Sequence, residues 1–456
     1  MMRMETIFRA YDIRGAYPDE LDEGIARRIG AGFVRLLHAE AIVVGRDMRL
    51  SSPSLTEAFI EGALSAGASV TDIGMVSTPL LYYAIIDGGF DGGAMVTASH
   101  LPGRMNGFKL CRENAIPLSG DTGLPALERL VAESPPVPPR PITGKYRRLS
   151  AMERYIEMLR SFIRPARPLK IVVDAGNGMA GPEVPRIAAK VPEWTFTFRD
   201  IEPDGRFPDH IANPLIPSTT LELQAEVVRE QADIGVAFDG DADRCGFIDE
   251  EGNRVPEDLV TALIAEAFLQ RHPGATILYD LRSSRVVPET IERLGGKAVR
   301  CRVGHAFIKA QMRREEALFA GELSGHYYYR DTGYTDNAVM TMIRMLDLLS
   351  AEQEPLSRLI APLKKYASTG EINIRVTDKD AVLAGLEERY SDAKIDRLDG
   401  LTVEYPSWWF NIRPSHTEPV LRLNLEAEDA GAVAAKRKEV FARITAIDPG
   451  MRRAAS

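Results

Sequence analysis

Apolar runs that end in polar, glycine-containing loops occur three times along the chain, and a helical pattern of apolar positions follows each one. The runs with their loops are AIVVGRDMR at 41–49, KIVVDAGNGMAG at 170–181 and TILYDLRSSR at 276–285. Each unit then has a second run of this kind, at 92–100, 233–244 and 317–326. Alternating strands and helices are typical of α/β domains, which bind ligands at the carboxyl ends of their strands. The pattern therefore predicts three related α/β units, each presenting a functional loop.

Local composition indicates where these units end. PPVPPRPITGK at 135–145 is typical of a stiff, extended segment, and the helical pattern after it has its apolar positions on one face. These positions are Met152, Tyr155, Ile156, Leu159, Phe162 and Ile163. The last quarter of the chain has a different, strand-rich pattern, which predicts a separate α+β domain. We expect domains at residues 1–148, 149–252, 253–366 and 367–456.

Composition restricts the kind of protein. The 456 residues are 45% hydrophobic, enough for several domain cores, but the longest apolar stretches fall far short of the ~20 residues that cross a bilayer. The N-terminal sequence lacks the apolar core of a signal peptide, so we expect a cytoplasmic protein that does not bind membranes. A net charge of −9 disfavours nucleic-acid binding. The cysteines, which are too few for a disulfide framework and are expected in the cores, are Cys111, Cys245 and Cys301.

The strongest local signal is FDGDADRCGFID, with Asp239, Asp241 and Asp243 at alternate positions. Carboxylates so close together repel one another unless a cation neutralises them, and ligation by oxygen alone suits Mg²⁺. An EF-hand is an alternative, with Glu250 at the twelfth position, but Arg244 stands where that loop needs glycine. A solvated acidic turn is the other alternative.

A second loop follows the apolar run GGAMV and contains Ser99 and His100. Taken alone, a serine after a strand is a turn or capping residue more often than a nucleophile. In an extended chain His100 points away from Ser99, and the nucleophile pattern G-x-S-x-G is absent. The case for a reactive Ser99 must come from the other motifs.

The loop DAGNGMAG offers a different function. Gly176, Gly178 and Gly181 match the dinucleotide-binding pattern G-x-G-x-x-G, and Asp200 ends the next strand-like run. Pro182 indicates that the helix begins at or after the third glycine, whereas the dinucleotide site needs the helix N-terminus close to the first two. An NAD-dependent oxidoreductase remains an alternative.

Two later motifs carry groups that bind sugars and phosphates. In GELSGH, Glu322, Ser324 and His326 stand at alternate positions, which in an extended segment sends all three side chains to one side. A carboxylate and a hydroxyl placed in this way can hold neighbouring sugar hydroxyls. RPSHTEP groups Arg413 with hydroxyl side chains in a turn, which suits a phosphate, although a capping turn is an alternative.

The motifs together resemble the α-D-phosphohexomutases, most closely the phosphomannomutase/phosphoglucomutase branch. The resemblance spans nearly the whole chain and rests on five motifs in the order of the family: YDIRG, TASHLPGRMNGFKL, DGDADR, GELSGH and RPSHTEPVLRL. It implies a heart-shaped enzyme of four domains around a central cleft, with three related mixed-sheet α/β domains and a C-terminal α+β domain. This agrees with the three units and the separate last quarter described above.

The resemblance also implies roles for individual residues. Ser99 matches the phosphoserine, which also contributes to the metal site formed by Asp239, Asp241 and Asp243. The matches to catalytic positions are Ser99, His100, Lys109, Arg14, Arg244 and His326. The matches to substrate-binding positions are Tyr11, Arg282, His305, Glu322, Ser324, Arg413, Ser415, His416 and Thr417. Arg282 stands where many members have lysine, and His416 occupies a variable position.

The implied activity is the interconversion of hexose 1-phosphate and hexose 6-phosphate, with mannose or glucose as the sugar. Ser99 donates its phosphoryl group to form a hexose 1,6-bisphosphate, and Lys109 or His326 accepts the proton of the attacking hydroxyl. The expected cofactors are Mg²⁺ and the hexose 1,6-bisphosphate as activator. The branches that act on glucosamine phosphate or acetylglucosamine phosphate share this chemistry and remain alternatives. We expect a monomer or a homodimer.

Overall fold

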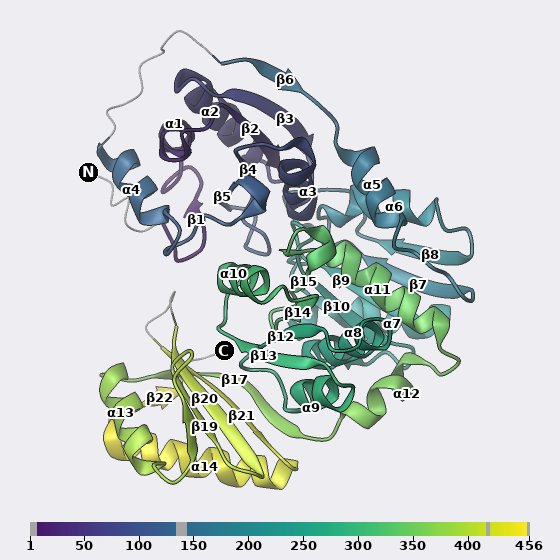
Figure 1. The fold of residues 1–456 in the computed structure, drawn as a ribbon, viewed down its shortest axis with the longest axis vertical. Coiled ribbons are helices and arrows are strands. Elements are labelled where there is room, and N and C mark those ends of the chain that lie inside the picture. The colour runs from purple at the N-terminus through teal and green to yellow at the C-terminus, as the bar shows by residue number, and fades with distance from the viewer. Residues whose placement is uncertain (1–6, 134–143, 416–419, 454–456) are drawn as a thin grey trace.

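The computed structural model describes residues 7–133, 144–415 and 420–453 and contains four separate β-sheets. Each sheet forms the centre of one domain. The sheets of the first and fourth domains lie at opposite ends of the long axis, and those of the second and third lie between them (Figure 1). Within the described residues, no helix is both long and apolar enough to span a membrane.

The first domain has a six-stranded sheet in the order β1-β5-β4-β2-β3-β6. Strands β2, β3, β4 and β6 run parallel, and β5 is antiparallel to both β4 and β1. Its strands are β1 Ile13–Ala16, β2 Ala41–Arg46, β3 Ser69–Met75, β4 Gly92–Val96, β5 Met105–Arg112 and β6 Tyr146–Arg148. Its helices are α1 Glu23–Leu37, α2 Ser52–Ser65, α3 Thr78–Gly88, η2 Glu113–Ala115 and α4 Leu124–Glu133.

The second domain has a five-stranded sheet in the order β11-β10-β9-β7-β8, in which β7, β8 and β9 are parallel. Its strands are β7 Leu169–Asp174, β8 Trp194–Arg199, β9 Ile234–Phe238, β10 Cys245–Asp249 and β11 Arg254–Val255. Its helices are α5 Met152–Arg160, α6 Ala180–Ala188, η3 Pro217–Thr220 and α7 Leu221–Glu230.

The third domain has a five-stranded sheet in the order β13-β12-β14-β15-β16, in which β12, β13 and β14 are parallel. Its strands are β12 Thr276–Asp280, β13 Lys297–Cys301, β14 Phe319–Gly321, β15 Tyr327–Tyr329 and β16 Thr335–Asp336. Its helices are α8 Glu257–Arg271, α9 Val286–Arg293, α10 His305–Glu315, η4 Arg330–Thr332, α11 Ala338–Ala351, α12 Leu356–Ile360 and η5 Ala361–Leu363.

The three sheets repeat one connection. Strands β2, β7 and β12 each pair in parallel with two neighbours, and one of these neighbours (β4, β9 or β14) then turns back into an antiparallel strand (β5, β10 or β15). The three turns are the serine loop (residues 97–104), the acidic loop (residues 239–244) and the sugar loop (residues 322–326). The three predicted units are therefore confirmed, and their functional loops occupy equivalent positions.

The fourth domain differs, because its sheet, in the order β18-β19-β20-β21-β17-β22, is antiparallel. This confirms the predicted α+β domain. Its strands are β17 Ala367–Arg375, β18 Lys394–Asp396, β19 Leu401–Glu404, β20 Trp408–Pro414, β21 Leu421–Ala427 and β22 Arg452–Arg453. Its helices are α13 Lys379–Arg389 and α14 Ala430–Ile447.

Packing separates the fourth domain from the others. One continuous apolar core runs through facing layers of the first three domains, whereas the fourth domain has a core of its own. The cysteines are all buried and free, as predicted. The exact residues at which the domains begin and end remain predictions; β11, at Arg254–Val255, pairs with the second sheet.

Candidate active site

A buried arginine holds the serine loop. The guanidinium of Arg49 donates hydrogen bonds to the carbonyl oxygens of Ser99 at 2.7 Å and Leu101 at 2.6 Å. It also donates to the carbonyls of Pro102 at 2.8 Å and Met105 at 3.0 Å. A planar group with five N–H donors can satisfy this many carbonyls at once, so Arg49 fixes the shape of the turn. The sequence analysis did not select Arg49, although it lies in the polar loop after β2.

The hydroxyl of Ser99 faces the acidic loop. Its Oγ donates to Asp239 Oδ2 at 2.8 Å and lies 3.1 Å from His100 Nδ1. The expectation that His100 points away from Ser99 is wrong, because Ser99 has a φ of 52° and the chain turns there instead of extending. Burial, together with the nearby Arg244 and Arg14, holds the pKa of His100 well below its ordinary value.

The carboxylates of the acidic loop are buried together, which excludes a solvated acidic turn. Asp239, Asp241 and Asp243 are at most 2% exposed, and one oxygen of each lies within 4.8 Å of the others. Lys109 Nζ is 2.6 Å from Asp241 Oδ2 and also contacts Asp243 Oδ2. Burial and the two neighbouring carboxylates raise the pKa of Asp239. Burial opposes ionisation of Asp243 as well, yet the Lys109 ammonium keeps its pKa well below the ordinary value.

The acidic loop fits a hard divalent cation. Asp241 Oδ1 is buried and has no hydrogen-bond partner among the described residues. The other oxygen of Asp241 accepts from Thr78 Oγ1 at 2.5 Å, a contact with α3 that the sequence analysis missed. Three carboxylates with free lone pairs and no nitrogen or sulfur ligand match the preference of Mg²⁺ for oxygen.

The acidic loop and the sugar loop meet at His326. Arg244 and His326 form a β-bridge, and Arg244 Nε lies 3.1 Å from His326 Nε2. Asp243 Oδ1 lies 3.3 Å from the same nitrogen. On the other side of the ring, Nδ1 is 2.7 Å from Ser324 Oγ and 3.1 Å from Glu322 Oε2. Although burial and Arg244 oppose protonation, the carboxylates of Asp243 and Glu322 raise the pKa of His326 to about 9.

The three side chains of GELSGH converge for a reason that differs from the prediction. They were expected to alternate along an extended segment, but β14 ends before Glu322 and the chain makes a tight turn. Gly325, with a φ of 79°, donates its N–H to Glu322 O at 3.0 Å. The turn, not strand alternation, brings Glu322, Ser324 and His326 together. Tyr328 fixes the carboxylate of Glu322 by donating a hydrogen bond to Oε2 at 2.8 Å.

Residues of the first domain approach the acidic loop and the third domain. Arg14 is buried, donates to Asp12 Oδ2 at 2.7 Å and lies in the field of the acidic loop. Tyr11 donates to Val303 O at 3.3 Å, and its ring meets that of His305 edge-on with centroids 5.6 Å apart. Burial raises the pKa of Tyr11 to about 12 and, with neighbouring cations, holds the pKa of His305 well below its ordinary value. These side chains therefore join the same region.

The predicted phosphate-binding arginines meet at a carboxylate that the sequence analysis missed. Glu371 Oε2, on β17, lies 2.7 Å from Arg413 Nη2 and 3.4 Å from Arg282 Nη1. Arg282 Nη2 is also 3.6 Å from Glu322 Oε1, so this chain of charges connects the third and fourth domains. Ser415 is buried, and its N–H donates to Val420 O at 2.9 Å. His416 and Thr417 lie outside the described residues.

Comparisons with known proteins agree with this assembly. Four family models described as phosphoglucomutase/phosphomannomutase match the chain: alpha/beta/alpha domain I at residues 5–135, domain II at 153–252, domain III at 256–366 and the C-terminal domain at 371–443. The chain belongs to the phosphoglucomutase/phosphomannomutase family. The predicted phosphohexomutase class, and with it the prediction of an isomerase, is confirmed.

Relatives in this family match over their full length. A phosphomannomutase of Escherichia coli is 42% identical, with 97% of this chain and 99% of the relative covered. A phosphomannomutase of Methanocaldococcus jannaschii is 37% identical, with 98% and 99% covered. The crystal structure of a phosphoglucomutase/phosphomannomutase family protein from Burkholderia thailandensis has a TM-score of 0.91 at 34% identity, with 99% and 100% covered.

Family membership changes the reading of the loop DAGNGMAG. Helix α6 begins at Ala180, and the loop before it packs on the acidic loop, where Met179 N–H donates to Gly240 O at 3.0 Å. A Cβ added at Gly178 would lie 2.9 Å from Gly240 O and 3.1 Å from Asp239 O. This glycine therefore permits close packing of two backbones, as an alternative to nucleotide binding.

Proposed function

We propose that the chain interconverts hexose 1-phosphates and hexose 6-phosphates, with Ser99 as the carrier of the phosphoryl group. The observation that carries this proposal is the contact of Ser99 Oγ with Asp239, at 2.8 Å, inside a buried group of three carboxylates. An oxygen nucleophile beside an all-oxygen cation site is the arrangement that phosphoryl transfer requires. Arg49 supports it by fixing the turn that carries Ser99.

Asp239, Asp241 and Asp243, with the Ser99 phosphoryl oxygens, would hold Mg²⁺. When bound, this ion neutralises negative charge on the group in transfer. Arg244, whose Nε lies 3.9 Å from both Asp239 Oδ2 and Asp243 Oδ1, adds a positive charge to the same place.

The transfer exchanges one oxygen–phosphorus bond for another. The bond between Ser99 Oγ and phosphorus breaks as a hydroxyl of the bound sugar phosphate bonds to the same phosphorus, and a hexose 1,6-bisphosphate results. After the sugar reverses its orientation, Ser99 takes the phosphoryl group from the other end. The bisphosphate is therefore both intermediate and activator, since it rephosphorylates Ser99 when the serine has lost its phosphate.

Geometry favours His326 over Lys109 as the residue that takes the proton of the attacking hydroxyl. His326 lies next to the predicted sugar-binding pair, 2.7 Å from Ser324 Oγ and 3.1 Å from Glu322 Oε2. Lys109 Nζ is occupied by Asp241 and Asp243. A general base must lie within hydrogen-bond reach of the proton it removes.

The substrates we propose are the phosphates of mannose and glucose. Full-length relatives are named phosphomannomutase, and Glu322 and Ser324 are placed to bind the neighbouring 3- and 4-hydroxyls, whose configuration is the same in both sugars. A site that does not hydrogen-bond the 2-hydroxyl discriminates on it by only about 1–3 kcal/mol. Tyr11, His305, Arg282, Arg413, Ser415, His416 and Thr417 complete the proposed binding set.

A kinetic comparison tests this specificity. We expect kcat/KM for mannose 1-phosphate and glucose 1-phosphate to agree within about a hundredfold, N-acetylglucosamine 1-phosphate to be clearly worse, and Glu322→Ala to lower both hexose activities together. A strong preference for the acetamido sugar would move the chain to another branch and leave the transfer chemistry standing.

The role of Ser99 is tested by mass and by rate. Freshly purified protein should contain a fraction with one additional phosphate on Ser99, and Ser99→Ala should lose at least ~100-fold in kcat. Ser161→Ala, at an exposed serine after α5, is the matched control and should behave as the unaltered chain. A phosphate on another residue, with a fully active Ser99→Ala variant, would reduce Ser99 to a turn residue.

A further inference from the structure

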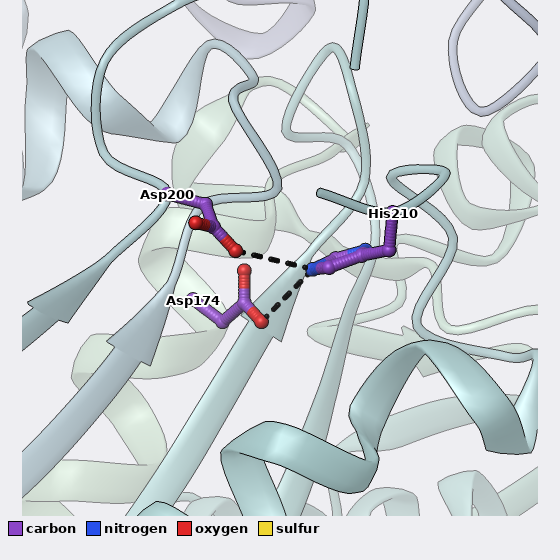
Figure 2. A group of neighbouring side chains, drawn as sticks. All are labelled: Asp174, Asp200 and His210. Carbon is purple, nitrogen blue, oxygen red and sulfur yellow. Dashed lines mark hydrogen bonds and ion pairs between the residues drawn. The ribbon is translucent and has the colours of Figure 1, made fainter. Parts of the chain in front are cut away.

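A second group of metal-binding side chains lies in the second domain and has no role in the proposed reaction. Asp174 is the last residue of β7, Asp200 directly follows β8, and His210 belongs to the segment between β8 and η3. Their ligand atoms lie within 4.8 Å of one another. Figure 2 shows the imidazole of His210 directed toward both carboxylates.

The spacing of these atoms suits a single metal ion. His210 Nε2 is 3.1 Å from Asp174 Oδ2 and 3.5 Å from Asp200 Oδ2. Nitrogen and oxygen ligands about 2.1 Å from one Zn²⁺ lie roughly 3.0 Å apart in octahedral and roughly 3.4 Å apart in tetrahedral geometry. The side chains are therefore already separated approximately as ligands of one ion would be.

Two hydrogen bonds from outside the group orient its members. His210 Nδ1 lies 3.0 Å from Ile211 O, a carbonyl that can only accept, so Nδ1 carries a proton and Nε2 is the nitrogen that faces the carboxylates. Asp174 Oδ1 accepts the N–H of Gly176 at 2.8 Å, which leaves Oδ2 directed toward His210. Metal-binding histidines and carboxylates are oriented by such outer contacts.

A proton on His210 does not satisfy the whole group. The hydrogen bond to Asp174 raises the pKa of His210 to about 9, and the proton on Nε2 is donated to Asp174 alone. Asp200 Oδ2 is buried and has no hydrogen-bond partner among the described residues. Next to it, Asn177, which is 6% exposed and donates its N–H to Asp200 O, also has a side-chain oxygen without a partner in the described chain. Burial and Asp174 raise the pKa of Asp200, as expected of a carboxylate without enough positive charge nearby.

We propose that Asp174, Asp200 and His210 form a second divalent-cation site, which binds a transition-metal ion of the Zn²⁺ class. One imidazole and two carboxylates form a ligand set that suits Zn²⁺, whereas the all-oxygen acidic loop suits Mg²⁺. The side chains of Asp200 and His210 are 15% and 20% exposed, so water can reach the ion and complete its coordination.

The ion would fasten the segment that follows β8 to the sheet. This segment reaches the serine loop: the ring of Phe207 lies 5.2 Å from the Arg49 guanidinium, and a Cβ added at Gly103 would lie 2.7 Å from Gly205 O. A metal ion bound by His210 would therefore brace the segment that packs against the serine loop from outside.

Calorimetric titration of Zn²⁺ into metal-free, full-length protein tests the site. Because Zn²⁺ also binds carboxylates, the titration uses a chain that carries Asp241→Asn, which impairs the acidic loop. We expect this chain to bind one Zn²⁺ and the affinity to fall at least about tenfold when Asp200→Asn or His210→Gln is added. His272→Gln, at the exposed end of α8, is the matched control and should leave the affinity unchanged.

A second measurement observes the ligand atom itself. In ¹⁵N spectra of the imidazoles, one equivalent of Zn²⁺ should shift Nε2 of His210 from its protonated to its metal-bound position, and thermal unfolding midpoints confirm that each variant folds. Zn²⁺ affinity that is equal in the Asp200→Asn, His210→Gln and control chains, or an Nε2 resonance that does not move, would overturn the site and identify His210 as an imidazolium held between two carboxylates.

Discussion

Two groups of carboxylates lie at the same edge of the second sheet, and they are neutralised in different ways. The acidic loop after β9 is at most 2% exposed, and its positive charges include Lys109 from β5 of the first domain. Asp174 and Asp200, after β7 and β8, face His210 from the same domain. The first group is complete only when two domains meet, whereas the second is complete within one domain.

This difference indicates which contacts depend on domain arrangement. Thr78 from the first domain and His326 from the third also contact the acidic loop. Movement of either domain therefore changes the charge around Asp241 and Asp243. The group around His210 is insulated from such movement, since its ligands and the outer contacts from Gly176 and Ile211 are all in the second domain.

Removing the Lys109 charge should break the comparison most strongly. Lys109→Met leaves two buried carboxylates without their cation, and loss of one partner from a buried ion pair costs about 3–5 kcal/mol. We expect a decrease of this size in the free energy of unfolding, measured by urea titration in EDTA, and a smaller decrease for His210→Gln, whose ion pairs are partly exposed. Lys170→Met removes an exposed lysine and should have almost no effect. Equal unfolding curves for Lys109→Met and Lys170→Met would contradict this account.

Removing one carboxylate from each group should sharpen the comparison. Asp241→Asn deletes a proposed Mg²⁺ ligand with little change in volume, so the Mg²⁺ concentration for half-maximal mutase activity should rise at least about tenfold. Asp200→Asn makes the same chemical change in the other group and should leave the Mg²⁺ dependence as it is. Activity assays over a series of Mg²⁺ concentrations measure both. An identical response of the two variants would show that the acidic loop does not bind the ion.

The smallest effect concerns pH. In metal-free protein the pKa of His210 is raised to about 9, compared with about 6.5 for an unfolded histidine. A raised pKa in the folded state stabilises the protein fully below pH ~6.5, and this contribution is lost as the pH rises through about 9. Urea unfolding in EDTA at pH 6 and pH 9.5 should therefore show a larger decrease for the unaltered chain than for His210→Gln. Parallel decreases in both proteins would refute the assignment.

Much of the site was predictable because its chemistry is concentrated in short motifs. The acidic triplet, the serine loop and GELSGH each end a strand, and the repeated strand pattern indicated that these ends lie in equivalent places. Side-chain convergence was harder to predict. The contact of Ser99 with His100 depends on a backbone φ of 52°, and Glu322 meets His326 through a turn at Gly325.

The residues that the sequence analysis missed are those whose partners are distant in the chain. Arg49 bonds to carbonyls about 50 residues away, and Thr78 contacts Asp241 from another domain. Glu371 is an ordinary residue of a strand until the fold brings Arg282 and Arg413 to it. Neither periodicity nor a motif marks such positions, because their role exists only after the domains are assembled.

The equivalent placement of the serine, acidic and sugar loops makes the enzyme modular at the scale of a single turn. Each copy of one structural unit has specialised the same hairpin: the β4–β5 turn carries the transferred group, the β9–β10 turn carries the charges that stabilise it, and the β14–β15 turn selects the sugar. Substrate choice can therefore evolve, or be engineered, by rewriting a few residues of the third hairpin while the machinery of transfer stays intact in the other two.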